Sequence, residues 1–201
     1  VWQAAQCPRA NFVLQKAIIT MCPEDVQFII DELPVALAAK HRTGCRIVQR
    51  LIEHCPPWQL SGLARAIERD FSAIARSQYG NYVIQCMAEY GSEEQRMQMT
   101  WLVAQEAKSL AADPYGAAAL SGAMAKGPAW GKELLARALL REQGLLVSFA
   151  CTRHGCGTVN RVLQVLRGQE RAEAQRLLAA QEARLRASRF GRTVAPKLQR
   201  P

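Results

Sequence analysis

The chain has 201 residues, of which 49% are apolar and 21% are charged; this composition predicts a folded protein and excludes a disordered one. Lys and Arg outnumber Asp and Glu by 26 to 17, and the formal net charge of +9 favours a polyanionic partner. The longest uncharged apolar stretches, such as residues 114–125, fall short of the ~20 residues that cross a bilayer, so no membrane span is expected.

The start of the chain and its cysteines bear on its origin. The sequence begins at Val1 and not at Met, so we expect a fragment or a processed product. The seven cysteines are an odd number, scattered through helix-like sequence without the density of a small disulfide scaffold. We interpret them as reduced thiols of an intracellular protein.

One short segment recurs six times along the chain. The copies are RANFVLQ (9–15), TGCRIVQ (43–49), YGNYVIQ (79–85), YGAAALS (115–121), HGCGTVN (154–160) and FGRTVAP (190–196). Counted from Ala10 through Gly44, Gly80, Gly116, Gly155 and Gly191, the steps are 34, 36, 36, 39 and 36 residues. A period of this size is typical of repeat proteins, in which each unit buries its apolar face against its neighbours.

Two apolar columns accompany the repeated segment. Six residues before each Gly stand Ala38, Ile74, Leu110, Phe149 and Leu185. Four residues after the Gly, or after Ala10 in the first copy, stand Leu14, Val48, Ile84, Leu120, Val159 and Ala195. We expect both columns to lie in the core.

The sequence between the copies has helical periodicity, with turn residues at regular intervals. Pro23, Pro56 and Pro57, Gly91, Gly127 and Pro128, and Gly168 each follow a copy, where a proline can open the next helix. Ser92 and Gln95 have the spacing of a capping box and predict one such start. Each unit is therefore predicted to be a short helix, a motif helix and a return helix, and the units to stack into an all-α solenoid of one domain, 1–201. The expected repeats are about 1–32, 33–69, 70–105, 106–144, 145–181 and a partial 182–201.

The third copy shows what the motif helix could present to a ligand. Asn81 and Gln85 are four residues apart and share one helix face, with Tyr82 beside them. We expect these three side chains to be exposed, and Val83 and Ile84 to point into the core. The matching positions are Asn11, Phe12 and Gln15 in the first copy and Cys45, Arg46 and Gln49 in the second. A planar group at the middle position can stack on a nucleobase, and an amide pair can meet a base edge.

These residues resemble the Pumilio family of RNA-binding repeat proteins, which read one base per helical repeat. HRTGCRIVQRLIEHC and, 36 residues on, SQYGNYVIQCMAEYG are similar to the fifth and sixth repeats of a Pumilio homology domain, and NFVLQKAI with VQFIIDEL is similar to the fourth. The resemblance covers almost the whole chain. It implies a right-handed, curved solenoid that binds single-stranded RNA on its concave face.

The resemblance also implies a role for each residue of the three trios. The base-edge residues would be Asn11, Gln15, Cys45, Gln49, Asn81 and Gln85, and the stacking residues Phe12, Arg46 and Tyr82. In the family an Asn and Gln pair with an aromatic reads uracil, and a Cys and Gln pair reads adenine. With the RNA antiparallel to the chain, the three units imply 5′-UAU-3′.

The later units depart from the family pattern. The fourth offers Ala117, Ala118 and Ser121, the fifth Cys156, Gly157 and Asn160, and the sixth Arg192, Thr193 and Pro196, where Pro disfavours a regular helix. Ser121, Asn160, Arg161 and Arg192 are the candidates for weak RNA contacts. Phosphate binding, protein binding and a purely structural role stay open for these units. The basic run 184–192 is either a solvated helix face or a phosphate contact.

Other kinds of site find little support in the sequence. Cys151, His154 and Cys156 lack a second ligand pair at zinc-like spacing, and repeat packing explains them better than a metal site. His41 and His54 have neither a nucleophile nor an orienting acid within sequence reach. We therefore expect no metal, no cofactor and no enzymatic activity.

The resemblance implies post-transcriptional control of messenger RNA, with protein co-repressors as further partners. We expect a cytoplasmic monomer, and the nucleolus and organelles stay open. Two alternatives remain: a low-specificity family member of the kind that acts in ribosome assembly, and a protein-binding scaffold of the HEAT or armadillo class.

Overall fold

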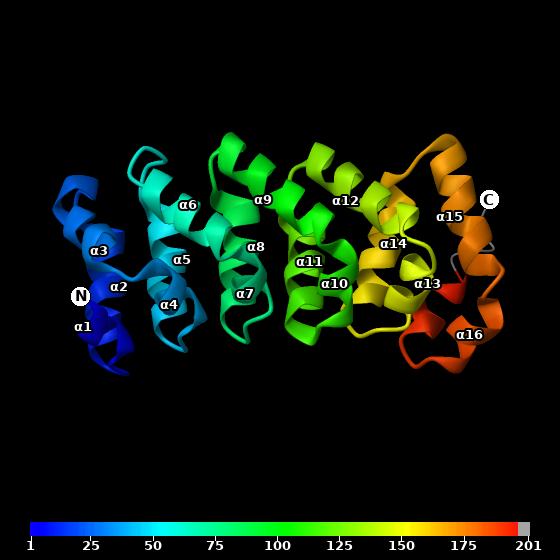
Figure 1. The fold of residues 1–201 in the computed structure, drawn as a ribbon, viewed down its shortest axis with the longest axis horizontal. Helices are drawn as coiled ribbons and strands as arrows, with labels where there is room; N and C mark the ends of the chain where they lie inside the picture. The colour runs from blue at the N-terminus through cyan, green and yellow to red at the C-terminus, as the bar shows by residue number, and fades with distance from the viewer. Residues whose placement is uncertain (197–201) are drawn as a thin grey trace. The chain divides into compact units, whose positions relative to one another are not determined.

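The computed structural model describes residues 1–196, and every regular element among them is a helix (Figure 1). The chain divides into two compact units: unit 1 runs from Val1 to Leu102, and unit 2 begins at Val103. Within each unit the helices follow one another in a fixed order of short helix, motif helix and return helix, as the repeat pattern predicts.

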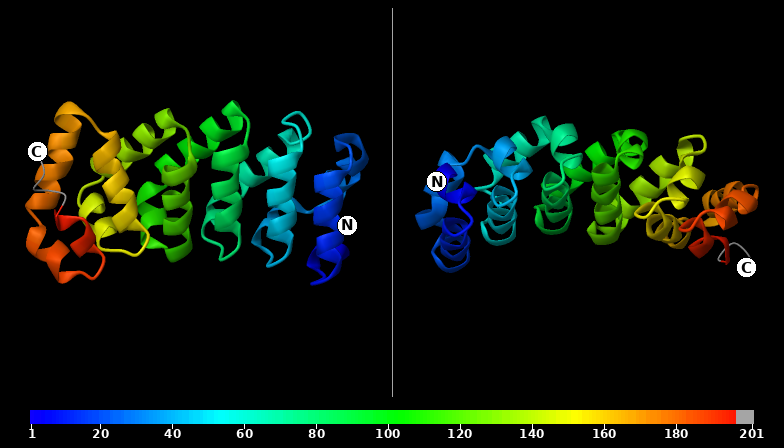
Figure 2. Two further views of the ribbon diagram at one scale, coloured as in Figure 1. Left: turned by 180° about the vertical axis from the view of Figure 1, so that it is seen from behind. Right: turned by 90° about the horizontal axis from the view of Figure 1, so that it is seen from below.

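Unit 1 holds repeats 1 to 3. Its short helices are α1 (Trp2–Gln6), α4 (Val35–Lys40) and α7 (Phe71–Ala75). Its motif helices are α2 (Ala10–Thr20), α5 (Gly44–His54) and α8 (Gly80–Tyr90). The return segments are η1 (Pro23–Val26) with α3 (Gln27–Glu32), α6 (Ser61–Arg69) and α9 (Glu93–Gln105), which continues past Leu102. The three motif helices pack side by side, α2 on α5 and α5 on α8, and form one row when unit 1 is viewed from behind (Figure 2).

Unit 2 repeats the same order. The short helices are α10 (Ala107–Ala112), α13 (Leu145–Ala150) and α16 (Glu182–Ala187). The motif segments are α11 (Pro114–Lys126), α14 (Gly155–Val165) and the 3-10 helix η2 (Gly191–Thr193). The return helices are α12 (Ala129–Arg141) and α15 (Gly168–Ala179). The last motif segment stays a 3-10 turn in the described residues, as Pro196 predicts.

The two predicted apolar columns form the core. Ile74, Leu110 and Leu185 are fully buried, and Phe149 is 1% exposed. In the second column Val48, Ile84, Leu120 and Val159 are fully buried and Ala195 nearly so. Leu14 is only half-buried, because α2 has a motif helix on one side only. Both columns are confirmed, with this one weaker position.

Local signals explain several helix starts. Ser92 and Gln95 form the predicted capping box, in which Gln95 N donates to Ser92 Oγ (3.2 Å) and Ser92 N donates to Gln95 Oε1 (3.0 Å). Pro23 occupies the first turn of η1, where its missing N–H costs no hydrogen bond. No helix in the described part of the chain is long and apolar enough to cross a bilayer.

Candidate functional site

Each motif segment after the first has, at its start or, in α11, two residues into the helix, a glycine that lies close to the preceding short helix. A Cβ on Gly80 would lie 2.3 Å from the carbonyl oxygen of Ile74, and one on Gly155 would lie 1.9 Å from that of Phe149. Gly44, Gly116 and Gly191 are similarly close to the carbonyls of Ala38, Leu110 and Leu185. A side chain would therefore push the two helices apart. This contact fixes the position of the motif helix on the core, and with it the position of the side chains that the helix presents.

A side-chain acceptor stands three residues before each motif glycine, and before Ala10 in repeat 1, and caps the helix. Ser77 Oγ accepts a hydrogen bond from Gly80 N (3.2 Å), and Asp113 Oδ1 accepts one from Gly116 N (2.7 Å). The acceptors of the six repeats are Cys7, His41, Ser77, Asp113, Thr152 and Ser188. These contacts satisfy N–H groups that a helix start otherwise leaves open. This column is not visible in the sequence, because its members share a hydrogen-bonding capacity and not a residue type.

The predicted stacking residues are exposed in unit 1. Phe12 is 62% exposed, Tyr82 is 55% exposed, and Arg46 is also in the exposed class. They occupy the same position on α2, α5 and α8, which pack side by side. Gln15, Gln49 and Gln85 are half-buried on the same three helices. We call the surface formed by Phe12, Gln15, Arg46, Gln49, Tyr82 and Gln85 the motif face.

The first position of each trio is buried, which corrects the expectation that the whole trio is exposed. Asn11 is 1%, Cys45 4% and Asn81 2% exposed. The amide nitrogen of Asn81 donates to the carbonyls of Ser77 (3.0 Å) and Gln78 (2.9 Å) at the start of α8. Asn11 makes the same pair of contacts with the carbonyls of residues 7 and 8. These asparagines therefore tie the motif helix to the turn before it.

The buried asparagines also hold the glutamines. Gln15 Nε2 donates to Asn11 Oδ1 (2.9 Å), and Gln85 Nε2 donates to Asn81 Oδ1 (3.0 Å). Each of these bonds uses the amide nitrogen of the glutamine. Its carbonyl oxygen and its second N–H remain for a ligand.

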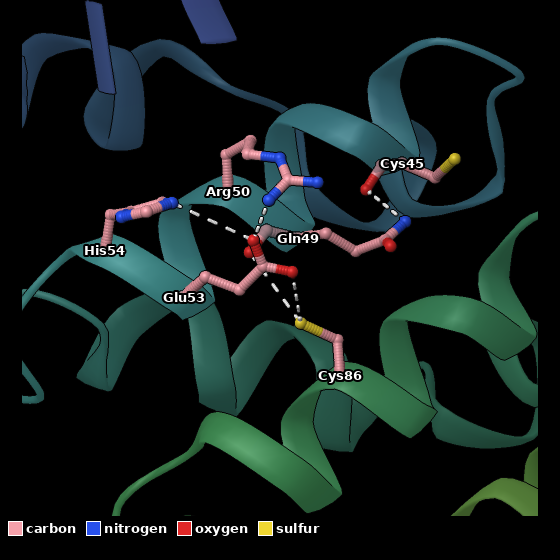
Figure 3. A network of polar contacts seen from close by, with 6 residues as sticks. All are labelled: Cys45, Gln49, Arg50, Glu53, His54 and Cys86. Carbon is pink, nitrogen blue, oxygen red and sulfur yellow. Dashed lines mark hydrogen bonds and ion pairs between the residues drawn. The ribbon is translucent and has the colours of Figure 1, made fainter. Parts of the chain in front are cut away.

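Repeat 2 fixes its glutamine differently, because Cys45 has no amide oxygen. Gln49 Nε2 donates to the backbone carbonyl of Cys45 (3.0 Å) (Figure 3). Burial raises the pKa of the Cys45 thiol, so the group stays neutral at pH 7. A neutral, compact side chain beside Gln49 distinguishes repeat 2 from its two neighbours.

A polar network behind Gln49 joins α5 to α8. The Cys86 thiol of α8 donates toward the Gln49 carbonyl (3.7 Å) and lies 3.8 Å from Glu53 Oε1 (Figure 3). Glu53 pairs with Arg50 and lies 3.9 Å from His54 Nε2. The helix that carries Gln49 is thereby anchored to the next motif helix.

A cavity of about 350 Å³ opens between the stacking residues of repeats 1 and 2. Phe12 and Arg46 both line it, together with Asn11, His41 and Arg42. A flat ligand in this space would meet an aromatic ring and a guanidinium plane. Two cations, Arg42 and Arg46, would also attract a negatively charged ligand.

The matching positions of repeat 4 carry no planar group. Ala117 is buried and Ala118 is half-buried. The Ser121 hydroxyl donates to the carbonyl of His154 (2.9 Å). The Thr158 hydroxyl in turn donates to the Ser121 hydroxyl (2.8 Å). Ser121 is thus engaged in joining α11 to α14, which is one of the roles left open for repeat 4.

Repeat 5 keeps an amide but replaces the stacking residue with Gly157. Asn160 stands at the glutamine position, and its Oδ1 is buried without a hydrogen-bond partner among the described residues. Arg161 Nη1 lies 3.7 Å from the place that a Cβ on Gly157 would take. The guanidinium of Arg161 therefore lies beside the position that the stacking residues take in unit 1.

The last basic run is partly engaged within the chain. Arg186 forms an ion pair with Glu182 (2.6 Å), and the guanidinium of Arg189 lies 5.5 Å from the ring centre of Phe190. Arg184 and Arg192 are exposed. Among the described residues of this run, Arg184 and Arg192 face solvent without such a contact to another described residue.

Among residues 1–196, no group of three or more His, Cys, Asp or Glu side chains is placed to hold a metal ion.

Stacked three-helix repeats with one row of planar and amide side chains define a helical-repeat binding protein. Four segments, residues 5–33, 37–67, 70–100 and 146–173, match the Pumilio-family RNA binding repeat. These segments cover more than half of the chain, which therefore belongs to the Pumilio family. Repeat 4 lies outside the matched segments although its three helices are in place. The family and its fold are those of RNA-binding repeats and not of enzymes.

Curated relatives share part of this chain. A Pumilio domain-containing protein of Schizosaccharomyces pombe is 28% identical over 138 residues, which are 67% of this chain and 20% of that protein. Pumilio homology domain family member 4 of Saccharomyces cerevisiae is 29% identical over 92 residues, 45% of this chain and 10% of that protein. The chain thus spans a fifth or less of the length of these relatives.

Solved structures share the fold of nearly the whole chain. The crystal structure of PUF-8 in complex with PBE-RNA matches 98% of this chain and 60% of that chain, with a TM-score of 0.86 and 28% identity. The Puf4 RNA binding domain, bound to a recognition sequence of HO endonuclease RNA, matches 98% of this chain and 62% of that chain, with a TM-score of 0.83 and 17% identity. The predicted all-α solenoid of helical repeats is confirmed by this likeness.

Proposed function

We propose that this chain binds single-stranded RNA on the motif face of unit 1, with one base for each repeat. The observation that carries the proposal is the row of exposed planar side chains, Phe12, Arg46 and Tyr82, each beside a glutamine that a hydrogen bond holds in place. Base stacking on such groups tolerates any sequence, and amide groups at the base edge add choice. The PUF-8 protein is 28% identical to this chain, and its structure contains RNA, which supports the same class of ligand here.

The preferred triplet in this proposal is 5′-UAU-3′. Gln49 offers the bidentate amide geometry that suits an adenine edge, and the neutral Cys45 beside it adds no competing charge. Gln15 and Gln85 have one N–H committed to an asparagine, and the acceptor and donor that remain match the alternating edge of uracil. Asn11 and Asn81 act at these edges mainly by positioning the glutamines.

The binding energy has a second, less selective source in this proposal. The net charge of +9 attracts phosphates and makes the affinity fall as salt rises. In unit 2, Asn160, Arg161 and Arg192 contribute weak contacts, whereas Ser121 is already bonded within the unit. A low-specificity role as in ribosome assembly is favoured only if repeats 4 to 6 dominate binding. Positions 118 and 157 carry Ala and Gly and so offer no planar side chain for base stacking, and this observation supports the low-specificity role as a second candidate.

A change of base preference tests the first candidate. Cys45→Ser, Arg46→Asn and Gln49→Glu together place a carboxylate where guanine offers two donors, and we expect the ratio of affinities for UGU over UAU to rise by at least about tenfold. Fluorescence anisotropy with short labelled oligonucleotides measures both affinities. Equal ratios in parent and variant would contradict base reading by repeat 2.

The cellular role that we propose is post-transcriptional control of messenger RNA by a cytoplasmic monomer, with co-repressor proteins as further partners. A reporter messenger RNA that carries the UAU element in its untranslated region should be expressed less when the parent chain is present. The triple variant should no longer reduce expression of the UAU reporter and should instead reduce expression of a reporter that carries UGU. Repression that ignores the base change would favour a protein-binding scaffold.

A further inference from the structure

A second surface of unit 1 has the features of a peptide-binding groove. The return helices α6 and α9 and the turn before α6 border a groove with a volume of about 900 Å³. Volumes of this size are common in ligand sites. Its lining comes from the return helices and the turn before α6, and none of the residues of the motif face takes part.

The lining of the groove includes large apolar side chains that are exposed to solvent. Trp58 is 64% exposed and Met97 is 54% exposed, and both line the groove with Ala64. Trp101, one helical turn beyond Met97, is 48% exposed and extends the apolar strip along α9. Large apolar side chains grouped at the surface and rimmed by polar residues mark interaction sites.

The rim of the groove is acidic although the chain as a whole is basic. Glu68 from α6 and Glu93 and Glu94 from α9 line it, against the single cation Arg65. Loss of hydration raises the pKa of Glu68, and the charge of Glu94 raises it further, whereas the guanidinium of Arg65 lowers it and so offsets part of this negative charge. A cation brought between these groups would relieve both costs.

We propose that the groove between α6 and α9 binds a peptide segment of another protein in which Lys or Arg residues flank large apolar side chains. The apolar side chains would cover Trp58 and Met97, and the cations would pair with Glu68, Glu93 and Glu94. The acidic rim disfavours RNA here, so the groove and the motif face have different partners. The inference does not depend on which bases the motif face prefers.

Two labelled peptides test the groove directly. The first alternates Arg and Lys with Leu and Phe, and the second carries Glu in place of every Arg and Lys. Because a chain of net charge +9 repels a basic peptide in general, binding of the first peptide requires a local acidic site. Anisotropy titrations with the full chain should show that the basic peptide binds, more weakly as salt rises, and that the acidic peptide does not.

Substitutions of the groove residues then test whether the basic peptide binds in the groove. Glu68→Gln with Glu94→Gln should weaken binding of the basic peptide by about tenfold, through two partly exposed charges. Met97→Ala should weaken it through lost apolar contact. Glu173→Gln, which removes one such charge at an exposed position of α15, should leave it unchanged. Affinity for the RNA oligonucleotides should be the same in the parent and in the groove variants.

Several results would overturn the proposal. These are equal binding of both peptides, no binding of the basic peptide, or an equal loss in Glu173→Gln and in the double variant. A drop in RNA affinity in the groove variants would assign the groove to nucleic acid instead. Self-association of the parent chain that the double variant abolishes, followed by sedimentation velocity, would make a second copy the occupant.

Discussion

Repeats 3 and 5 begin their motif helices in the same way and end with different surfaces. Gly80 and Gly155 both touch the carbonyl six residues earlier, and Ser77 and Thr152 both cap them. The position two residues after the glycine is nevertheless Tyr82 in one repeat and glycine in the other. In these two repeats the scaffold depends on a backbone contact that leaves room for glycine only, whereas the surface position carries no packing constraint. Unit 2 can therefore lose the surface chemistry of unit 1 and keep the fold.

The largest effect should follow from changing the shared contact. Gly80→Ala and Gly155→Ala each place a Cβ against a carbonyl oxygen, and we expect a loss of about 3 kcal/mol in the free energy of unfolding. Urea unfolding followed by circular dichroism measures this loss. Gly62→Ala in α6 is the matched control: its Cβ meets no atom within 4 Å and should stabilise the chain by about 0.5–1 kcal/mol. If Gly80→Ala and Gly155→Ala leave the free energy of unfolding nearly unchanged, the scaffold does not depend on these glycine contacts.

The next effect concerns the surface on which the units differ. Tyr82→Ala should weaken RNA binding by ~1–3 kcal/mol, because base stacking on the ring is lost. The free energy of unfolding should hardly change, since the side chain is 55% exposed. Ala118→Ser at the equivalent position of unit 2 should leave affinity unaltered. Anisotropy titration of both variants checks the difference, and an equal loss in both would show that the units do not differ in this respect.

A smaller effect is expected when repeat 3 is made to resemble repeat 4. Asn81→Ala installs the residue that repeat 4 has at Ala117 and removes the bonds to the Ser77 and Gln78 carbonyls. We expect a loss of about 1 kcal/mol in the free energy of unfolding. Gln85 also loses its acceptor, so RNA affinity should fall together with stability. Unchanged affinity would mean that Gln85 needs no positioning.

The smallest effect separates the units by pH. Loss of hydration lowers the pKa of His154 in unit 2, and Arg153 lowers it further. A lowered pKa means that the unfolded chain binds the proton more readily than the folded one. Stability is thus fully present above the usual value of about 6.5 and is lost as pH falls below it. Because the ring is largely exposed, solvent screens this effect.

A matched substitution checks the pH effect. His154→Gln should match the parent in urea unfolding at pH 8 and lose less stability than the parent at pH 5.5. The expected difference is below about 0.5 kcal/mol. A parent and a variant that respond identically to pH would exclude His154 as the source.

Much of the fold could be predicted from the sequence, because glycine spacing and two apolar columns are read directly from residue types. Exposure of Phe12 and Tyr82 followed from helix geometry in the same way. Burial of Asn11 and Asn81 did not, because their partners are carbonyls of the preceding turn, which every residue type carries. The engagement of Ser121 with His154 also lay beyond the pattern, since it joins residues 33 positions apart. The peptide groove needed the spacing of α6 and α9, which only three-dimensional structure provides.

The cap in front of each motif helix has a consequence for tracing the history of such chains. The same hydrogen bond is accepted by a thiol, an imidazole, two serine hydroxyls, a carboxylate and a threonine hydroxyl. Substitution among these residue types therefore preserves the cap without conserving one amino acid. Repeat 4 lies outside the segments that match the family repeat, although Asp113 and Gly116 keep the cap there. A sequence pattern that accepts any hydrogen-bond acceptor three residues before the motif glycine would therefore detect diverged repeats that residue identity alone does not.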